Sequence, residues 1–268
     1  MRLALIATTY ERPDALTRVL ETLARQSSAP DELLIADDGS GPETRAVVAG
    51  FAAGSAFPVR HLWREHQGFQ PGRMRNRAIA DARSEYLVLI DGDMLLHPDF
   101  VADHRRAARR GCYTQGTRVL LNGSATRHSL ATGELPHLAS SGLSGRRRLY
   151  AWHAPRVSRL VGRLANSLIA IKSCNQGLWR KDLLKVNGFD ETLPGWGSAD
   201  KELCARLENA GIARRSILFA AIAFHLYHGP ADRSSHARNT AALAATRATG
   251  RVWCDHGIVT GAHRSCGN

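Results

Sequence analysis

The stretch YLVLIDGDM, residues 86–94, joins an apolar run to two carboxylates, Asp91 and Asp93. The run Tyr86–Ile90 has the continuous hydrophobic pattern of a strand buried in a parallel sheet. In such sheets ligands bind beyond the carboxyl ends of the strands, which is where this pair stands. Two carboxylates at this spacing repel each other unless a cation lies between them or one is protonated. Their oxygens suit Mg²⁺ or Mn²⁺, and a solvated Asp-Gly turn is the alternative reading.

Towards the N-terminus, short apolar segments alternate with amphipathic helices. Strands are predicted at residues 3–8, 32–36 and 59–63, and helices from about Pro13, at 43–53 and through 76–82. This repetition predicts an α/β fold with a doubly wound, mostly parallel sheet and flanking helices. There is no GxGxxG after the first strand and no GxxxxGK[ST], which disfavours a dinucleotide site or a P-loop.

Polar side chains also follow the first two predicted strands. Thr8 and Thr9 end the first, and Asp38 follows the second within DDGSGP. A carboxylate there can accept hydrogen bonds from a ribose or a base. The alternative is that Asp38-Gly39 simply makes the turn.

After Gly111 the pattern changes. TQGTRVLL, residues 114–121, is predicted to be a strand, and residues 122–145 a polar loop. Regular elements resume with a helix at Ala199–Ala210 and a buried strand at ILFAAIAF, residues 217–224. The tail beyond Arg233 is predicted to form one helix and then a loose end.

The chain is strongly basic: 36 Lys and Arg against 24 Asp and Glu give a formal net charge of +12. This balance favours a polyanionic partner, which could be nucleic acid, anionic lipid or a phosphorylated glycolipid. No apolar stretch approaches the roughly 20 residues of a membrane span, and the N-terminus lacks signal-peptide features. The 5 cysteines form no CxxC pair and are expected to be free thiols. We therefore expect a soluble, cytoplasmic protein.

The segment at residues 146–172 is basic and amphipathic. Apolar residues recur from Pro155 at helical spacing, with arginines to the other side: Val157, Leu160, Val161, Leu164 and Leu168 against Arg156, Arg159 and Arg163. Such a helix can lie on an anionic membrane surface. The alternative is a helix packed on the domain with a solvated arginine face. The chain has no aromatic-interleaved platform or recognised nucleic-acid module, so we expect no nucleic-acid partner.

Several segments, in a fixed order, carry a resemblance to a known family. Four segments resemble the donor half of family 2 glycosyltransferases with the GT-A fold: TTYERPDAL (8–16), ELLIADDGS (32–40), EHQGFQPGRMRNRAIADA (65–82) and YLVLIDGDM (86–94). Two later segments resemble the acceptor half shared by β-1,4-galactosyltransferases and chondroitin-polymerase-type enzymes: CNQGLWRKDLLKVNGFDETLPGWGSADKELCARL (174–207) and HLYHGP (225–230). The resemblance covers residues 1–121 and 172–230.

For the donor half, the resemblance implies a binding site for a nucleotide sugar, UDP-linked, and for Mn²⁺ or Mg²⁺. The residues that it assigns to the nucleotide are Thr8, Thr9, Asp38, Arg75, Asn76 and Asp91. Asp93 is implied as the metal-binding carboxylate, and His225 or His228 as the late metal-ligating histidine. Without the resemblance, either histidine is more simply a packed core or surface residue.

For the acceptor half, the resemblance implies acceptor contacts at Asn175, Trp196 and Gly197, and a catalytic base at Asp200. An Asp in the first turn also favours the helix dipole, and Ser198 can cap the helix, so Asp200 has a structural alternative. The sequence departs from the family at Ala199, where a Glu usually helps to hold the acceptor. This departure puts the identity of the acceptor in doubt.

Together these observations predict a metal-dependent, inverting hexosyltransferase. Its acceptor is expected to be a hydroxyl of a glycan or glycolipid, such as bacterial surface polysaccharide or lipopolysaccharide, reached from the inner face of the cytoplasmic membrane. A sugar nucleotidyltransferase and a non-catalytic, polyanion-binding protein are the alternatives. The expected division is a donor half at 1–121, a basic variable insert at 122–172, and an acceptor and catalytic half with the tail at 173–268.

Overall fold

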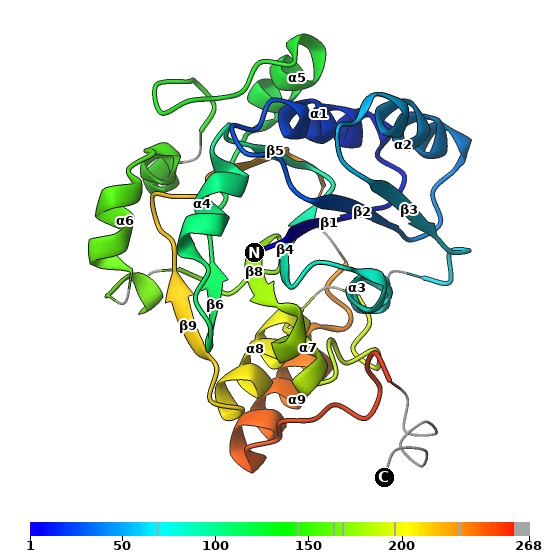
Figure 1. Ribbon diagram of the computed structural model, residues 1–268, viewed down its shortest axis with the longest axis vertical. Helices are drawn as coiled ribbons and strands as arrows, with labels where there is room; N and C mark the ends of the chain where they lie inside the picture. Colours follow the sequence, from blue (N-terminus) through cyan, green and yellow to red (C-terminus); the bar gives the residue numbers. More distant parts are fainter. Residues whose placement is uncertain are drawn as a thin grey trace.

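A seven-stranded sheet forms the centre of the protein, in the order β3-β2-β1-β4-β8-β6-β9 (Figure 1). The computed structural model describes residues 1–68, 70–143, 145–162, 164–167, 169–195, 197–229 and 232–259. The strands of this sheet are β1 (Leu3–Thr9), β2 (Glu32–Asp37), β3 (Val59–Trp63), β4 (Tyr86–Asp91), β6 (Cys112–Gln115), β8 (Asn175–Trp179) and β9 (Ala213–Ser216). Strands β1 to β4 are parallel, and β8 runs antiparallel to both β4 and β6. Both halves of the chain therefore share one sheet and one domain, and the predicted α/β fold is confirmed.

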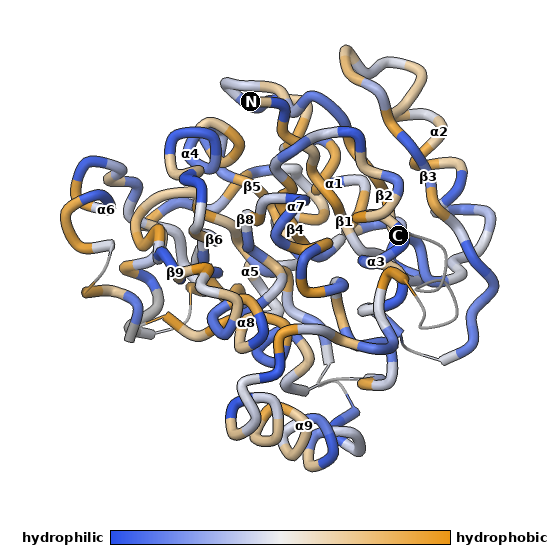
Figure 2. The backbone as a smooth tube through the Cα atoms, turned by 60° about the horizontal axis from the view of Figure 1, so that its bottom comes forward, coloured by the Kyte–Doolittle hydropathy of each residue, from blue (hydrophilic) through white to orange (hydrophobic). Residues whose placement is uncertain are grey.

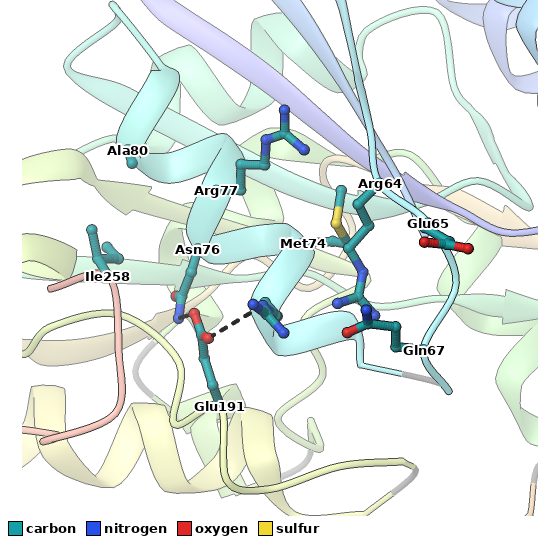
Figure 3. A pocket seen from close by; sticks show the side chains of 10 residues that line it. Arg64, Glu65, Gln67, Met74, Asn76, Arg77, Ala80, Glu191 and Ile258 are labelled. Atoms are coloured by element: carbon teal, nitrogen blue, oxygen red, sulfur yellow. Dashed lines mark hydrogen bonds and ion pairs between the residues drawn. The ribbon is translucent and has the colours of Figure 1, made fainter. Parts of the chain in front are cut away.

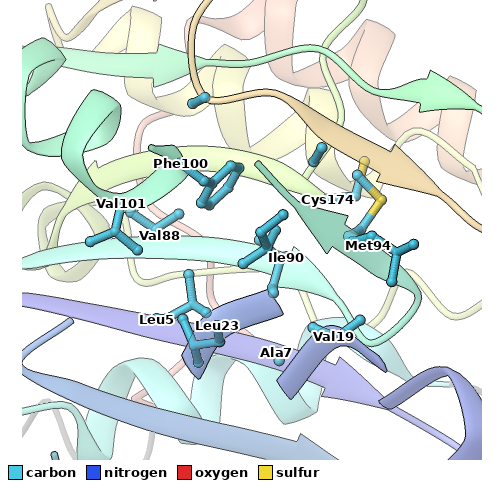
Figure 4. Packing of buried hydrophobic residues seen from close by; sticks show 14 of the residues in the cluster. Leu5, Ala7, Val19, Leu23, Val88, Ile90, Met94, Phe100, Val101 and Cys174 are labelled. Atoms are coloured by element: carbon cyan, nitrogen blue, oxygen red, sulfur yellow. The ribbon is translucent and has the colours of Figure 1, made fainter. Parts of the chain in front are cut away.

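Helices cover both faces of this sheet. Because side chains alternate along a strand, Leu3, Leu5 and Ala7 of β1 enter one buried cluster, whereas Ala4 and Ile6 enter another. The first cluster also takes residues from α1 (Pro13–Ala24), α2 (Pro42–Gly54) and α4 (Phe100–Ala107) (Figure 4). The second takes residues from α3 (Pro71–Asp81), α7 (Arg180–Lys185) and α8 (Ala199–Asn209).

A small second sheet, in the order β5-β10-β7, corrects two of the predicted strands. Its members are β5 (Met94–Leu96), β7 (Val119–Leu120) and β10 (Ala223–His225). Residues 114–121 are not one strand but parts of β6 and β7, interrupted at 116–118, where Gly116 packs closely against the Asn175 amide. The predicted strand at 217–224 is mostly a buried turn, with positive φ at Phe219 and Ala221, and only its end joins β10.

Two predictions for residues 122–172 are also wrong. The expected loop at 122–145 contains α5 (Gly123–Thr132), which Asn122 caps by accepting a hydrogen bond from the Ala125 N–H. The expected long amphipathic helix is the short α6 (Pro155–Val161), preceded by the 3₁₀ helix η1 (Gly145–Ala151) and followed by η2 (Leu164–Ser167). Arg163 and Leu168 lie outside the described residues. Helix α6 sits at the periphery of the molecule, with polar and apolar residues along its exposed side (Figure 2).

The C-terminal segment adds α9 (His236–Thr249), which contacts α8 and confirms the predicted tail helix. The loose end predicted beyond it falls partly on residues 260–268, which the structure does not describe. Within the described part of the chain, no helix combines the length and the hydrophobicity that a membrane span requires.

The pairing of the strands gathers several segments at the carboxyl edge of β4. Thr8 is level with Asp91 in the parallel β1–β4 pair. Ile90 is level with Asn175 in the antiparallel β4–β8 pair, so residues 173 and 174 arrive beside the end of β4. His225 is level with Met94 in the β10–β5 pair. This edge is where the candidate site residues must meet.

Candidate active site

A hydrogen-bonded group of three side chains lies at the end of β4. The Thr8 hydroxyl donates to the Asp91 carboxylate at 3.1 Å. Arg75, from the first turns of α3, donates to the same Asp91 oxygen at 2.8 Å. The structure thus brings these three predicted donor-binding residues together. Both of these hydrogen bonds end on Asp91 Oδ1, and Oδ2 accepts none from the described residues.

The close approach of Gly92 to β1 explains why a glycine separates Asp91 and Asp93. Its N–H donates to the Thr8 carbonyl at 2.7 Å. A Cβ at this position would lie 2.9 Å from the same oxygen and 3.1 Å from the side chain of Thr9. Any larger residue therefore pushes the end of β4 away from β1, and Asp93 with it.

Asp93, His225 and His228 form a candidate metal-binding group at the start of β5 and the end of β10. One Asp93 oxygen, Oδ2, lies 3.5 Å from His225 Nε2 and 3.6 Å from His228 Nε2. The other oxygen, Oδ1, is buried and has no hydrogen-bond partner in the described chain. One potential ligand atom of each residue lies within 4.8 Å of the others.

The electrostatics of this group fit a divalent cation. Burial, and then the charge of Asp91, raise the pKa of Asp93 above its ordinary value. Burial, and then the charge of Arg118, lower the pKa of His225, so its imidazole is neutral and free to ligate. An orphaned carboxylate oxygen beside two imidazoles is the donor set expected before a cation neutralises it. Both histidines that the resemblance left as alternatives are placed at this group.

Asp200, in the first turn of α8, lies near the start of β8. Its Oδ2 accepts a hydrogen bond from the Ser173 N–H at 3.2 Å. Burial raises its pKa, against the opposing effects of the Ser173 N–H and the charges of Arg75 and Lys172. Ser198 holds the N-cap position but its side chain makes no capping bond, and its hydroxyl lies 3.4 Å from that of Thr240. Capping by Ser198 is therefore not observed.

The neighbouring carboxylates are already committed to the protein interior. Glu202 is fully buried and pairs with Arg206 and with Arg251, each at 2.8 Å. Asp190 accepts hydrogen bonds from the N–H and the hydroxyl of Thr192. The oxygens of Asp200 accept hydrogen bonds as well, but from two neutral backbone donors, the N–H groups of Ser173 and Lys201.

At the other end of the site, Asp38 follows β2 and is held by β3 and the segment after it. Arg64 pairs with Asp38 Oδ1 at 2.6 Å, and the Gln70 N–H donates to Oδ2 at 3.2 Å. The rings of Tyr10 and His66 stack nearby, with centroids 4.2 Å apart. Gly39 permits this approach, because a Cβ there would meet the His66 backbone nitrogen at 2.5 Å.

Two predicted site residues have structural positions instead. Asn76 is buried, and its amide bonds to the N–H and the carbonyl of Phe189 and to Glu191. Asn175 is buried too, donating to the carbonyls of Thr117 and Ala221 and contacting His104 at 3.0 Å. Every polar atom of both amides is thus used inside the protein, and the assignment of Asn76 to the nucleotide and of Asn175 to the acceptor stays a prediction.

The remaining acceptor-side predictions have different outcomes. Trp196 lies outside the described residues. Gly197 has φ +156°, and a Cβ there would meet the Asn239 amide at 3.0 Å, so the glycine allows the close approach of α9. Thr9 is buried, and its hydroxyl is without a partner in the described residues.

A cavity of about 390 Å³ lies on the α3 side of the molecule, between Arg64, Arg73 and Glu191 (Figure 3). Its lining includes neither carboxylate of the DGD stretch nor Asp200. It therefore does not coincide with the candidate chemical centre, although Arg64 connects it to Asp38.

The fold and this edge of the sheet define the GT-A class of glycosyltransferases. The structure of residues 1–349 of TarS from S. aureus in complex with UDP superposes with a TM-score of 0.64 and 17% identity, covering 93% of this chain and 68% of that chain. A mannosyltransferase from Pyrobaculum calidifontis, in complex with GDP-Man and Mn²⁺, superposes with a TM-score of 0.56 and 16% identity, covering 88% of this chain and 59% of that one. At these identities the likeness shows the fold.

The sequence places the chain within this class. The family model "Glycosyl transferase family 2" matches residues 4–166, and "N-terminal domain of galactosyltransferase" matches residues 167–229. The chain belongs to glycosyl transferase family 2.

Curated relatives cover most of this chain but only part of their own length. Validoxylamine A glucosyltransferase of Streptomyces hygroscopicus subsp. limoneus is 29% identical over 78% of this chain and 48% of its own length. Chondroitin synthase of Escherichia coli is 26% identical over 83% of this chain and 34% of its own length. The chain thus spans about half or less of these relatives.

Proposed function

We propose that the chain transfers a sugar from a nucleoside diphosphate donor, UDP-linked, to a hydroxyl group, with inversion at the anomeric carbon. The observation that carries this proposal is the orphaned carboxylate of Asp93 between two imidazoles, with Asp200 available nearby. The names of the relatives and the nucleotides bound by the two fold neighbours agree with it.

The donor is proposed to lie along the carboxyl edge from β2 to β4. Asp38 accepts a hydrogen bond from the ribose or the base, and Tyr10 and His66 offer a stacked aromatic surface beside it. Thr8, Thr9 and Asp91 line the same edge, and Arg75 fixes the orientation of Asp91. This placement brings the diphosphate towards Asp93.

Asp93, His225 and His228 are proposed to hold Mn²⁺ or Mg²⁺. The two imidazoles favour Mn²⁺, because Mg²⁺ prefers a shell of oxygen ligands. When bound, the cation neutralises negative charge on the diphosphate of the donor. The chain supplies a carboxylate that burial has left without a counter-charge and, at His225, an imidazole whose lowered pKa keeps it neutral at pH 7.

Asp200 is proposed to act as the general base. Its carboxylate takes the proton of the acceptor hydroxyl while that oxygen attacks the anomeric carbon and the nucleoside diphosphate leaves. The Ser173 N–H orients one carboxylate oxygen, and the raised pKa makes Asp200 a stronger base than a free aspartate. Inversion follows because the attack is direct and on the face opposite the leaving group.

The acceptor is proposed to be a glycan or glycolipid of a bacterial surface polysaccharide or lipopolysaccharide. Trp196 and Gly197 remain the predicted acceptor contacts. Ala199 leaves this pocket without the carboxylate that the family usually has there. The proposed location is the inner face of the cytoplasmic membrane, which the exposed leucine and arginines of α6 support.

The proposed function is tested by incubating the chain with a panel of nucleotide sugars and Mn²⁺ and detecting released nucleotide by mass spectrometry. We expect slow hydrolysis of a UDP-sugar that stops in EDTA. Calorimetry with UDP and Mn²⁺ accompanies the screen, since a pure polyanion-binding protein shows no metal-dependent nucleotide binding. Absence of both signals contradicts the proposed function.

A further inference from the structure

We propose that Arg118 and Lys172 form a subsite for a carboxylate carried by a sugar, so that the substrate pair of this enzyme includes a uronate. This inference rests on the proposed function and adds the chemical class of one substrate.

The subsite is a small cavity between the segments that enter β7 and β8. It is lined by Gly116, Thr117, Arg118, Tyr150, Ile169, Ala170, Lys172 and Cys174, and its volume is about 90 Å³. That volume has room for a carboxylate group.

The cavity lies between the two parts of the proposed active site. Cys174 belongs to the same buried cluster as Met94, the residue after Asp93 (Figure 4). Ser173, on the other side, donates its N–H to Asp200. The charge of Arg118 acts on Asp93 and His225, and the charge of Lys172 acts on Asp200, lowering the pKa of each. A sugar placed between the metal group and the base therefore has this cavity beside it.

Arg118 has no anionic partner within the described parts of the chain. Its guanidinium contacts the Cys174 sulfur at 3.9 Å, and its Nε–H is buried without a hydrogen-bond partner there. A half-buried guanidinium in this state is costly unless a ligand supplies the counter-charge. Its planar donors match a carboxylate in two-point geometry, which a sugar hydroxyl cannot reproduce.

The backbone around the cavity is held in place independently of any ligand. The Gln115 amide donates to the Lys172 carbonyl at 3.0 Å and accepts from the Lys172 N–H at 3.2 Å. A Cβ at Gly116 would overlap the Asn175 amide, at 2.3 Å from its nitrogen, so a glycine is needed where the two segments touch. The two cations are therefore presented from fixed segments.

The test compares matched neutral and acidic sugars, first on the donor. Calorimetry in Mn²⁺ measures the affinity of the parent for UDP, UDP-glucose and UDP-glucuronate. If the uronate is on the donor, UDP-glucuronate binds about 10- to 100-fold more tightly than UDP-glucose, the scale of a charge-assisted hydrogen-bonded pair. Arg118→Gln and Lys172→Gln remove most of this preference, whereas the exposed Arg25→Gln, which also loses one positive charge, keeps it.

The second arm repeats the comparison on the acceptor, with p-nitrophenyl glucuronide and p-nitrophenyl glucoside titrated into the UDP–Mn²⁺ complex. A preference for the acidic sugar in either arm that the two variants lose supports the subsite and identifies its source. No preference in both arms, or a preference that the variants keep, overturns it. A tenfold loss of affinity for UDP itself in Arg118→Gln also overturns it, because the arginine then serves the diphosphate. Failure of UDP–Mn²⁺ to bind the parent contradicts the proposed function instead.

Discussion

At Asp93, one carboxylate oxygen is buried without a partner while the other faces His225 and His228. The side chain is only 15% exposed, so water cannot fully solvate its charge. The Gly92 N–H donates to the Thr8 carbonyl at 2.7 Å, and this backbone hydrogen bond fixes the position of Asp93. An uncompensated carboxylate held this firmly is stabilised most by a cation that ties it to the imidazoles.

The first prediction concerns this carboxylate. We expect Asp93→Asn to weaken binding of UDP in the presence of Mn²⁺ by at least about tenfold, because the amide cannot supply the negative charge that the cation needs. EDTA should abolish turnover of the parent. Isothermal titration calorimetry and a released-nucleotide assay measure both effects. Asp81→Asn, at an exposed carboxylate at the end of α3, is the matched control and should behave as the parent. Full activity in EDTA contradicts the metal assignment.

The second prediction concerns Asp200. Asp200→Asn keeps an oxygen for the Ser173 N–H, so the fold should survive while the base is lost. We expect kcat to fall by roughly 100-fold or more, the usual scale for a general base, with the affinity for UDP unchanged. Steady-state kinetics and calorimetry give the two values. Turnover equal to that of the parent places the base elsewhere.

Asp200 also determines the expected pH dependence. Burial raises its pKa above the ordinary value of an aspartate, and only the ionised carboxylate accepts a proton. The kcat/KM of the parent should therefore fall as the pH decreases through the raised pKa, at a higher pH than for a free aspartate. The acid limb should be absent from the residual activity of Asp200→Asn. An identical limb in parent and variant assigns the titration to another group.

The acidic side chains that the sequence singled out and the two amides differ in their surroundings in the fold: Asp93 keeps a buried oxygen without a partner in the described residues, whereas both amides are fully hydrogen-bonded inside the protein. Asp91, Asp93 and Asp200 stand in short motifs at element ends, where both the topology and the resemblance point to chemistry. Asn76 and Asn175 stand in equally suggestive places, but the sequence does not show which way a side chain points. The cavity that Arg118 and Lys172 line together could not be predicted either, because these residues are 54 positions apart in the chain and share it only in the folded protein.

At the scale of elements, α3 is joined to the turn after α7 by the Asn76 amide. Its nitrogen donates to the Phe189 carbonyl at 2.8 Å, and its oxygen accepts from the Phe189 N–H at 2.8 Å. This pair of bonds ties the donor half to the segment that leads towards Asp200. We therefore expect the amide to contribute to stability across the two halves.

The third prediction tests that reading. Asn76→Ala leaves the buried Phe189 N–H without an acceptor, so we expect a loss of about 1–3 kcal/mol in the free energy of unfolding. Binding of UDP and Mn²⁺ to the folded variant should be unchanged. Urea unfolding and calorimetry provide the two measurements. Arg73→Gln, on the same helix, removes only an exposed 3.8 Å pair with Glu191 and should cost under about 1 kcal/mol. Weaker UDP binding at parental stability returns Asn76 to the nucleotide site.

The elements predicted well from the sequence are those with regularly spaced apolar residues and a clear signal at their end. Helix α1 has its apolar residues on one face, and α8 ends before a glycine, Gly211, at positive φ. The elements that it predicted poorly depend on tertiary contacts. The break between β6 and β7 is set by the contact of Gly116 with Asn175, and the buried turn at 217–222 has the composition of a strand. Neither constraint can be predicted from the spacing of apolar residues or from secondary-structure propensity.

At the scale of the whole molecule, the excess positive charge and the exposed apolar residues meet on the insert. Leu160 is 83% exposed and Leu164 is 79% exposed, and Leu149 and Trp152 are exposed beside them. Arg148, Arg156 and Arg159 are exposed on the same segment. Leu160 therefore does not pack on the domain, as the alternative of a packed helix requires, although Val161 packs against a small buried cluster.

Hydrogen bonds and ion pairs attach this segment to the domain. His153 lies 2.8 Å from Asp103, which also accepts the Ala221 N–H and pairs with Arg106. The hydrogen bond from His153 to Asp103 raises the pKa of this histidine. The bond between them is therefore charge-assisted below the raised pKa and weakens above it. The leucines consequently project from a segment that His153 anchors to Asp103 of α4.

The last prediction is that this surface docks on an anionic membrane. Each Lys or Arg near such a surface contributes on the order of 1 kcal/mol, and the exposed leucines add by entering the headgroup boundary. In co-sedimentation, the parent should bind vesicles that contain anionic lipid, and binding should fade as salt screens the charges. Leu160→Ser with Leu164→Ser should lower the binding that persists at high salt, because this part is hydrophobic. Arg156→Ser with Arg159→Ser should lower the part that salt removes. Arg25→Ser with Arg45→Ser removes the same charge from α1 and α2 and serves as the control for net charge. Equal binding to neutral vesicles, or equal losses in the control, contradicts docking through the insert, since net charge alone is then sufficient.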